Sequence, residues 1–300
     1  MLTAASFRYR LVGVALSAAC LVFGGCGSGA GGTGRKPLVV ATTTQIGDLV
    51  RAVGGDRVAV HQILAANTDP HEYEPRPDDV RATTGARVVL VNGDNLDSWI
   101  SKIVAQAGRH PRVVDLGTVV PVRLPGESSG KGASRVDPHW WHDPRNVVVA
   151  VERIRAELAR ADPSGAQQFA RNASAYLAKL RTLDRGIARC IATVPAARRK
   201  LVTSHDAFAY LAHRYGLTVV GAIIPSQTTQ AAPSAGDIAA LVKQLRRERV
   251  SAIFLESSIN PKLTRAVARE TGALGNLTLY GDTLGSAGSR GATYLAMEAA

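Results

Sequence analysis

The stretch Asp137-Pro138-His139-Trp140-Trp141-His142-Asp143-Pro144 lies between two long segments of ordinary composition in a chain of 300 residues. It places two imidazoles and two carboxylates between prolines, which stiffen the backbone and lower the entropy that a loop loses when it binds a ligand. On both sides, short apolar runs alternate with stretches of helical periodicity. This alternation predicts an α/β fold with mainly parallel sheets, organised in two halves around the quoted stretch.

The half before this stretch contains short apolar runs at residues 38–41 and 88–91, an alternating segment at 58–64 and a short segment at 113–115, which we predict to be strands. The run at 88–91 is apolar throughout, as expected of a parallel strand covered on both faces. After the quoted stretch, Asn146 is the predicted cap of a helix that Asp162-Pro163 ends. We therefore expect an N-terminal α/β lobe over residues 37–165.

Apolar residues then recur at three- and four-residue steps from Phe169 to Val194, which predicts one amphipathic helix over residues 166–194. At 1.5 Å per residue this helix would be about 40 Å long, enough to join two lobes. A long surface helix of one domain is the alternative. Cys190 lies in the apolar stripe and is expected to be a small core residue. Residues 195–300 repeat the α/β rhythm as a C-terminal lobe, in which Ser234 and Asp237 form a capping pair.

Residues 1–25 have the anatomy of a secretory signal peptide, with two arginines before an apolar run. The residues before Cys26 look like a bacterial lipobox, although Phe23 stands where leucine is more usual. Cys26 would then carry a lipid, with simple secretion or an uncleaved anchor as alternatives. Residues 26–36 are rich in glycine and read as a flexible tether.

The net charge of +12 raises the question of nucleic-acid binding. The basic residues are scattered, however, without interleaved aromatic residues, and an exported protein rarely meets nucleic acid. We therefore expect no nucleic-acid partner, and attraction to an anionic membrane surface is the better interpretation of the charge.

Four residues are candidate metal ligands because each follows a predicted strand, where α/β sheets bind their ligands: His71, His139, His205 and Asp282. Three imidazoles and one carboxylate form a shell that suits Zn²⁺, since Mn²⁺ and Mg²⁺ favour more oxygen ligands. Taken singly, each can equally be a loop residue that is hydrogen-bonded to its neighbours. A closed four-ligand site argues against catalysis, and the chain has no His-Glu-x-x-His pattern of a zinc hydrolase.

Several motifs together resemble the zinc- and manganese-specific solute-binding lipoproteins of bacterial ABC importers. They are Asp69-Pro70-His71, Asp137-Pro138-His139, His205-Asp206-Ala207-Phe208, Phe254-Leu255-Glu256 and Gly281-Asp282-Thr283-Leu284-Gly285. The resemblance covers nearly the whole chain after the tether. It implies two α/β lobes joined by one long helix, with a metal bound between them by His71, His139, His205 and Asp282.

The resemblance also implies the function of the protein. It would be a lipid-anchored, extracytoplasmic receptor, without enzymatic activity, that captures Zn²⁺ and delivers it to an ABC permease. In this family a histidine at the position of His205 goes with zinc, whereas manganese and iron members have a glutamate there. A manganese-binding homologue, or an adhesin-like surface lipoprotein with a structural zinc, is the alternative. We expect a monomer.

Two further residues bear on this site. His142 departs from the leucine that is usual in the family, and three roles stay open for it: an extra or alternative ligand, a residue that contacts a ligand, or a surface residue. Glu256 ends a predicted strand and could orient a ligand histidine, or be an ordinary hydrogen-bonding residue between the lobes.

Overall fold

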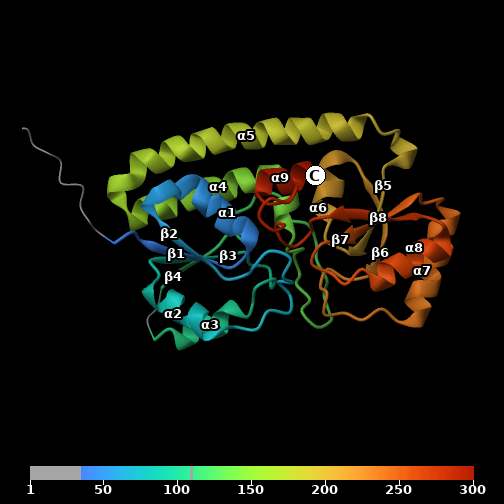
Figure 1. Ribbon diagram of the computed structural model, residues 1–300, viewed down its shortest axis with the longest axis horizontal. Helices are drawn as coiled ribbons and strands as arrows, with labels where there is room; N and C mark the ends of the chain where they lie inside the picture. Colours follow the sequence, from blue (N-terminus) through green and yellow to red (C-terminus); the bar gives the residue numbers. More distant parts are fainter. Residues whose placement is uncertain (1–34, 109–110) are drawn as a thin grey trace, which may run out of the picture. The chain divides into compact units, whose positions relative to one another are not determined.

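The first half of the chain forms a four-stranded parallel sheet of order β2-β1-β3-β4 (Figure 1). The computed structural model describes residues 35–108 and 111–300, of which Lys36–Ala300 form one unit. The predicted signal peptide, Cys26 and most of the predicted tether lie outside the described residues. The strands of the sheet are β1 (Leu38–Ala41), β2 (Ala59–Gln62), β3 (Val88–Val91) and β4 (Arg112–Asp115).

Helices cover both faces of this sheet, because alternate side chains of a strand point to opposite faces. Val39 and Leu90 pack against α1, α4 and α5 on one face, whereas Val40 and Val89 pack against α2 and α3 on the other. All residues of β3 are buried, as its apolar sequence predicts. The helices are α1 (Thr44–Gly54), α2 (Pro77–Gly85), α3 (Ile100–Gln106), α4 (Pro144–Ala161) and α5 (Ala166–Ala192).

The start of α4 differs from the prediction. Asp143, and not Asn146, is the N-cap, and its carboxylate accepts a hydrogen bond from the Arg145 backbone N–H at 2.9 Å. Pro144 takes the first helical position, where its missing N–H costs nothing. Asn146 lies inside the helix and instead fixes the preceding loop, since its side chain bonds both backbone groups of Val122, at 2.9 and 3.0 Å.

The predicted long helix is present as α5, which ends two residues before the predicted end. It runs from the first half of the chain to the second (Figure 1). Its buried side chains all lie in its first part, between Phe169 and Leu180. Cys190 is exposed, so the prediction that it is a core residue is wrong. The apolar stripe continues past Leu180, but little of the protein packs over that part of the helix.

The second half repeats the α/β arrangement with two parallel strand pairs, β5–β6 and β7–β8, in which β5 lies beside β7. The predicted capping pair is confirmed, because Ser234 and Asp237 form a capping box at the start of α7. The elements are β5 (Lys200–His205), α6 (Ala209–Tyr215), β6 (Thr218–Ile224), α7 (Ala235–Arg247), β7 (Ala252–Glu256), α8 (Lys262–Thr271) and β8 (Leu274–Leu279). Short 3₁₀ helices are η1 (Gly55–Arg57), η2 (Trp140–His142), η3 (Pro163–Gly165) and η4 (Ala196–Arg198).

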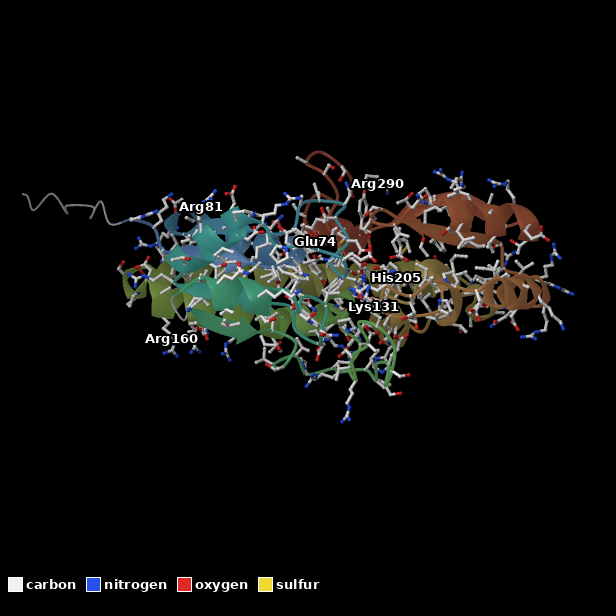
Figure 2. All side chains as sticks on the ribbon, turned by 90° about the horizontal axis from the view of Figure 1, so that it is seen from below. Glu74, Arg81, Lys131, Arg160, His205 and Arg290 are labelled. Atoms are coloured by element: carbon white, nitrogen blue, oxygen red, sulfur yellow. The ribbon has the colours of Figure 1, made fainter. Side chains whose placement is uncertain are left out.

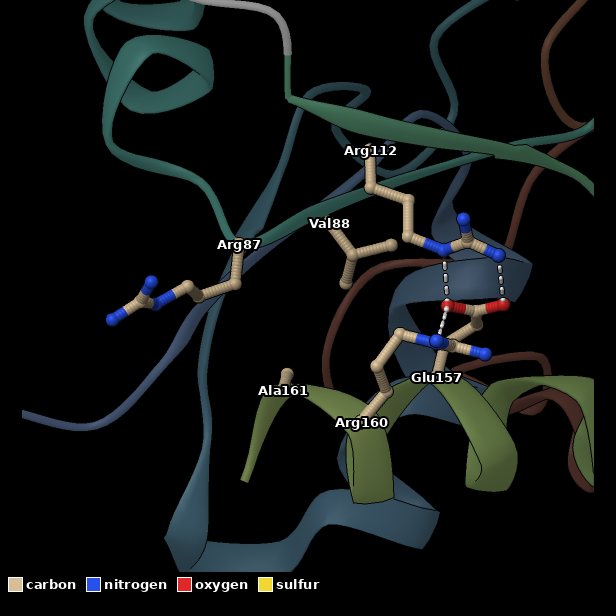
Figure 3. A pocket seen from close by; sticks show the side chains of 6 residues that line it. All are labelled: Arg87, Val88, Arg112, Glu157, Arg160 and Ala161. Atoms are coloured by element: carbon tan, nitrogen blue, oxygen red, sulfur yellow. Dashed lines mark hydrogen bonds and ion pairs between the residues drawn. The ribbon is translucent and has the colours of Figure 1, made fainter. Parts of the chain in front are cut away.

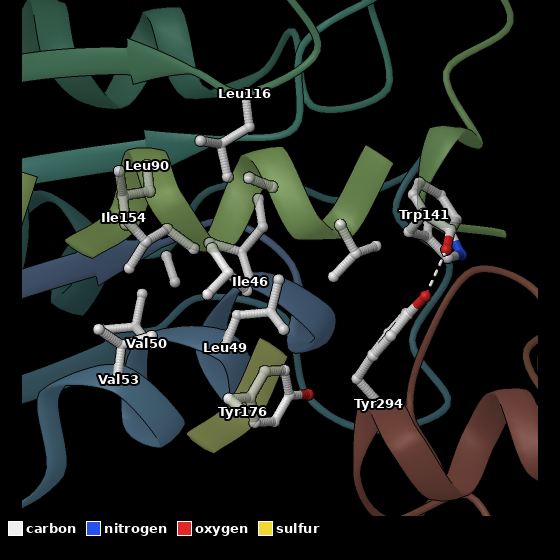
Figure 4. Packing of buried hydrophobic residues seen from close by; sticks show 14 of the residues in the cluster. Ile46, Leu49, Val50, Val53, Leu90, Leu116, Trp141, Ile154, Tyr176 and Tyr294 are labelled. Carbon is white, nitrogen blue, oxygen red and sulfur yellow. Dashed lines mark hydrogen bonds between the residues drawn. The ribbon is translucent and has the colours of Figure 1, made fainter. Parts of the chain in front are cut away.

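The last helix, α9 (Tyr294–Ala299), returns to the first half and packs against α1 and α5. Tyr294 is fully buried beside the core of that half, and its hydroxyl donates to the carbonyl oxygen of Trp141 at 2.7 Å (Figure 4). The chain therefore crosses between the lobes again after the long helix. The predicted lobe limits of 37–165 and 195–300 stay a prediction, and these contacts show that the final residues belong in space with the first lobe.

Near the N-terminal ends of the strands of the first sheet, Glu157 of α4 is 3% exposed and fixes this helix to β4. Its carboxylate accepts two hydrogen bonds from Arg112, at 2.6 and 2.9 Å (Figure 3). The pocket at this edge is lined by Arg87 and Arg160 as well. This pocket lies at the N-terminal ends of the strands, whereas the four candidate ligands lie at or after the carboxyl ends. Among the helices of the described residues, none is long and apolar enough to cross a membrane.

Candidate metal centre

The four candidate ligands come from four separate segments, each at or after the carboxyl end of a strand. His71 follows β2, His139 follows β4, and Asp282 follows β8. His205 is the last residue of β5, whose strand is longer than predicted. The structure brings these four residues together, with one donor atom of each within 4.8 Å of all the others. Figure 2 shows His205 near the middle of the view, where segments of the two halves meet.

The distances from Asp282 to the three imidazoles are close to those between neighbouring donors of a tetrahedral metal shell. The carboxylate of Asp282 lies 3.4 Å from Nε2 of His139, 3.4 Å from Nε2 of His205 and 3.8 Å from Nε2 of His71. In a tetrahedral zinc site with bonds of about 2.0 Å, neighbouring donors are about 3.3 Å apart. The separations from Asp282 are thus about 0.1 to 0.5 Å longer than in such a site, with His139 facing Oδ1 and the other two histidines facing Oδ2.

These donor atoms are also buried without partners. The three Nε2 atoms and both oxygens of Asp282 are inaccessible to solvent and make no hydrogen bond with the described residues. His139, His205 and Asp282 are fully buried, and His71 is 8% exposed. Buried polar groups are nearly always paired, so five converging unpaired atoms need an explanation. A cation bound among them supplies it.

Two of the histidines are oriented by carboxylates on the far side of the ring. Asp137 lies 2.7 Å from Nδ1 of His139, and Glu256 lies 2.7 Å from Nδ1 of His205. Glu256 also accepts a hydrogen bond from the backbone N–H of His205 at 2.8 Å. Such carboxylates keep the proton on Nδ1 and leave Nε2 free to bind a metal. Of the two roles left open for Glu256, its position behind the ring favours that of orienting His205, which stays a prediction.

Asp137 was not predicted as a functional residue, although the sequence carries a signal for it. In both Asp-Pro-His motifs the aspartate accepts a hydrogen bond from the backbone N–H of the histidine two residues later. The distances are 2.9 Å for Asp69 with His71 and 3.0 Å for Asp137 with His139. This Asx turn is a common use of aspartate and fixes the backbone of the histidine.

Gln45 was also missed, and no local pattern in the sequence indicates it. Its side-chain amide donates to the backbone oxygen of Asp282 at 2.8 Å. Thr44 accepts a hydrogen bond from the backbone N–H of Leu284, also at 2.8 Å. Both residues lie in the first turn of α1, far from Asp282 in the chain. These two hydrogen bonds attach the loop of Asp282 to α1 of the first lobe.

One family model, with the description "Zinc-uptake complex component A periplasmic", matches residues 39–300. The chain belongs to this family. The resemblance that the motifs carry is thereby confirmed. Members of the family are extracytoplasmic metal-binding components of ABC importers and not enzymes.

Individual relatives agree on the family but differ in the metal of their names. The metal ABC transporter substrate-binding lipoprotein SloC of Streptococcus mutans is 32% identical over 267 residues, covering 88% of this chain and 87% of the relative. The manganese-binding lipoprotein MntA of Halalkalibacterium halodurans is 32% identical over 294 residues, covering 97% and 94%. The solved periplasmic zinc-binding protein TroA of Treponema pallidum has a TM-score of 0.81 at 30% identity, covering 88% and 95%. These matches confirm the fold of two parallel-sheet lobes with one long helix.

His142, which departs from the family pattern, does not join the four candidate ligands. It is 2% exposed, so the interpretation as a surface residue is wrong. Its Nδ1 lies 2.9 Å from Oε1 of Glu298 in α9, and its ring stacks on Phe208 at 4.6 Å between centroids. The extra histidine thus connects the 3₁₀ turn after His139 with the last helix and with the second lobe.

The charged groups of the metal-free site shift one another's pKa values. Burial lowers the pKa of His71 to about 3. Burial also opposes protonation of His139 and His205, but neighbouring carboxylates outweigh it, raising the pKa of His139 to about 9 and that of His205 well above its usual value. Burial alone would raise the pKa of Asp282, yet the three histidines hold it well below its usual range. Two protonated histidines therefore surround one carboxylate at neutral pH, and a metal ion would replace their protons.

We predict that Glu256→Gln lowers the affinity for Zn²⁺ by about 10- to 100-fold, the usual effect of losing a carboxylate behind a ligand histidine. The amide cannot stabilise the proton on Nδ1 of His205 as the carboxylate does. Competition with a chromophoric chelator measures the affinity. Glu270→Gln is the control, because that glutamate is exposed and pairs with Arg246. An affinity equal to that of the wild type in both variants would contradict the role of Glu256.

Proposed function

We propose that this chain captures Zn²⁺ at His71, His139, His205 and Asp282 and delivers it to the permease of an ABC importer. One observation carries the proposal: three Nε2 atoms and one carboxylate, all buried and unpaired, converge with one donor atom of each within 4.8 Å of all the others. The ion is cargo, so the chemistry required of the chain is reversible coordination. A closed shell of protein ligands suits storage and release better than catalysis, which needs an open metal position.

The donor set supports zinc over manganese. Imidazole nitrogen is a borderline ligand that zinc accepts readily, whereas manganese favours carboxylate, carbonyl and water oxygens. Here nitrogen donors outnumber the carboxylate. Relatives named for manganese and for zinc match this chain comparably, so overall similarity does not decide between the metals. A manganese-binding homologue is therefore the second candidate.

The relatives' names also support the proposed location. SloC and MntA are named lipoproteins, and SloC is named as the substrate-binding component of a metal ABC transporter. For this chain we propose lipid attachment at Cys26, a flexible tether over residues 26–36, and action as a monomer at the outer face of the membrane. The permease would receive the ion from the buried site.

We predict that the zinc affinity rises with pH across the neutral range. A histidine binds metal only after it loses its proton, and His139 and His205 both have raised pKa values in the metal-free site. Binding would thus release about two protons, so the affinity should increase up to about 100-fold per pH unit from pH 6.5 to 8.5 and less steeply above about pH 9, the pKa of His139. Chelator competition at several pH values measures the slope. An affinity independent of pH would contradict histidine coordination.

Growth of the host tests delivery as distinct from binding. A strain that lacks the gene should fail to grow in zinc-depleted medium, and added Zn²⁺ should restore growth. The wild-type gene should complement the defect, whereas the Asp282→Ala gene should not. Rescue by Mn²⁺ alone would favour the manganese-binding candidate. Normal growth of the deletion strain, in the absence of another zinc importer, would favour an adhesin-like role.

A further inference from the structure

A short segment after β6, residues 226–230, connects the candidate metal centre with the first lobe at two points. We call it the strap. At one end, the side-chain amide of Gln230 donates a hydrogen bond to the backbone carbonyl of His71. At the other end, the carboxylate of Glu127 accepts hydrogen bonds from the Ser226 hydroxyl at 2.8 Å and from the Gln227 backbone N–H at 2.9 Å. Glu127 lies in the loop between β4 and η2, so both partners of the strap belong to the first half of the chain.

Internal hydrogen bonds make the strap one structural unit. The backbone N–H of Thr228 donates to the Ser226 hydroxyl at 3.3 Å, and that of Gln230 donates to the Thr228 hydroxyl at 3.2 Å. Ser226 is 8% exposed and Thr228 3% exposed. Because these bonds link the two ends, loss of the Glu127 contacts should also weaken the contact of Gln230 with His71.

Of the three candidate histidines, His71 is the one whose ring has no carboxylate beside Nδ1 among the described residues. Carboxylates lie 2.7 Å from Nδ1 of His139 and of His205, but among the described residues the nearest carboxylate to the His71 ring is that of Asp282, on its metal-facing side. Its backbone N–H is held by Asp69, and its carbonyl by the strap. Its position therefore depends on its loop more than on its ring. It is also the only one of the four candidates with measurable exposure.

We propose that Glu127 acts as a latch that closes the strap over the metal centre and slows the release of the bound ion. Glu127 is a positioning residue: it acts through Ser226 and Gln227 and, among the described residues, makes no hydrogen bond or ion pair with the four candidate ligands. Opening this latch frees the strap, loosens the loop of His71 and lets the ion leave from that side. This inference rests on the proposed function, because a release rate presupposes bound metal.

The latch should control dissociation without changing the coordination shell. We expect Glu127→Ala to raise the rate of Zn²⁺ release to a fast chelator about tenfold, equivalent to 1.4 kcal/mol, with little change in the association rate. Glu127→Gln should give a smaller increase, because it keeps one oxygen acceptor but loses the charge that strengthens both bonds. The absorption spectrum of bound Co²⁺ should be the same in wild type and variants. A role confined to folding stability would not separate the two rates in this way.

Matched variants separate the latch from a general effect of charge. Glu74→Ala removes the same charge from the exposed part of the His71 loop (Figure 2), and Glu74 makes no hydrogen bond or ion pair among the described residues. It should leave the release rate unchanged, and an equal acceleration in this variant would overturn the latch. Ser226→Ala should accelerate release, and the double variant with Glu127→Ala should be less than additive, since the two side chains share one bond. Full additivity would count against the pair.

Amide hydrogen exchange tests the latch even in the absence of metal. In the metal-free full chain, Glu127→Ala should accelerate exchange of the Gln227 amide, which donates to the carboxylate. If the wild-type chain binds no zinc, the proposed function fails. The exchange rate of the Gln227 amide then decides alone whether Glu127 holds the strap closed. If the wild type binds zinc and Glu127→Ala releases it at the wild-type rate, the latch is wrong and the proposed function stands.

Discussion

Asp282→Ala should lower the affinity for Zn²⁺ about ten-thousandfold, equivalent to about 5.5 kcal/mol. Asp282 is the one negatively charged donor among the four candidates, and its two oxygens face all three histidines. The variant should also destabilise the metal-free protein, because His139 and His205 lose the buried carboxylate that raises their pKa values. Chelator competition measures the first effect, and thermal unfolding in the presence of a strong chelator measures the second.

Glu157→Gln is a suitable control for this variant. Glu157 is also buried and paired, but with arginines at the opposite edge of the first sheet. Its replacement should destabilise the protein and leave the zinc affinity unchanged. If Asp282→Ala binds zinc within tenfold of the wild type while it remains folded, the carboxylate is not a ligand.

His71→Ala should lower the zinc affinity about a thousandfold, equivalent to about 4 kcal/mol, but should scarcely change the stability of the metal-free protein. Burial lowers the pKa of His71 to about 3, so its ring is neutral in the folded protein and stabilises no buried charge at neutral pH. Its Nε2 atom also has no hydrogen-bond partner to lose among the described residues. The same two measurements as for Asp282→Ala apply.

Added imidazole makes the His71 experiment sharper. The truncated side chain leaves space at the most exposed of the four positions, so free imidazole should enter and restore part of the zinc affinity. His61→Ala is the control, because His61 lies 3.0 Å from Asp79 and outside the four-residue cluster. A fall in affinity without imidazole rescue, accompanied by a large loss of metal-free stability, would indicate a structural role for His71 instead.

The α/β architecture and the long helix could be predicted because both depend on local patterns. The strand β3 is apolar throughout because it is buried on both faces, and α5 has a periodic apolar stripe because one side of the helix packs on the core. The periodicity of α5 did not indicate at which residue the buried part of the helix ends. The stripe of α5 extends beyond Leu180 without burial, and for this reason the interpretation of Cys190 was wrong.

The four candidate ligands could be selected from sequence because parallel strands bring their carboxyl ends to one edge, and because whole motifs matched a family. Contacts between residues far apart in the chain gave no such signal. The position of α9 on the first lobe buries His142 against Glu298, which no pattern around His142 indicates. Gln45 and Glu127 likewise act on segments more than ninety positions away.

The most direct test of the account is a competition titration of the metal-stripped chain, carrying Cys26→Ser to remove the proposed site of lipid attachment. Zn²⁺ and Mn²⁺ would each compete with a chromophoric chelator. The account predicts one tight equivalent of Zn²⁺ with a Kd near nanomolar, equivalent to about −12 kcal/mol, and much weaker binding of Mn²⁺. The absence of a tight site, or a preference for Mn²⁺, would contradict the assignment of this chain as a zinc receptor.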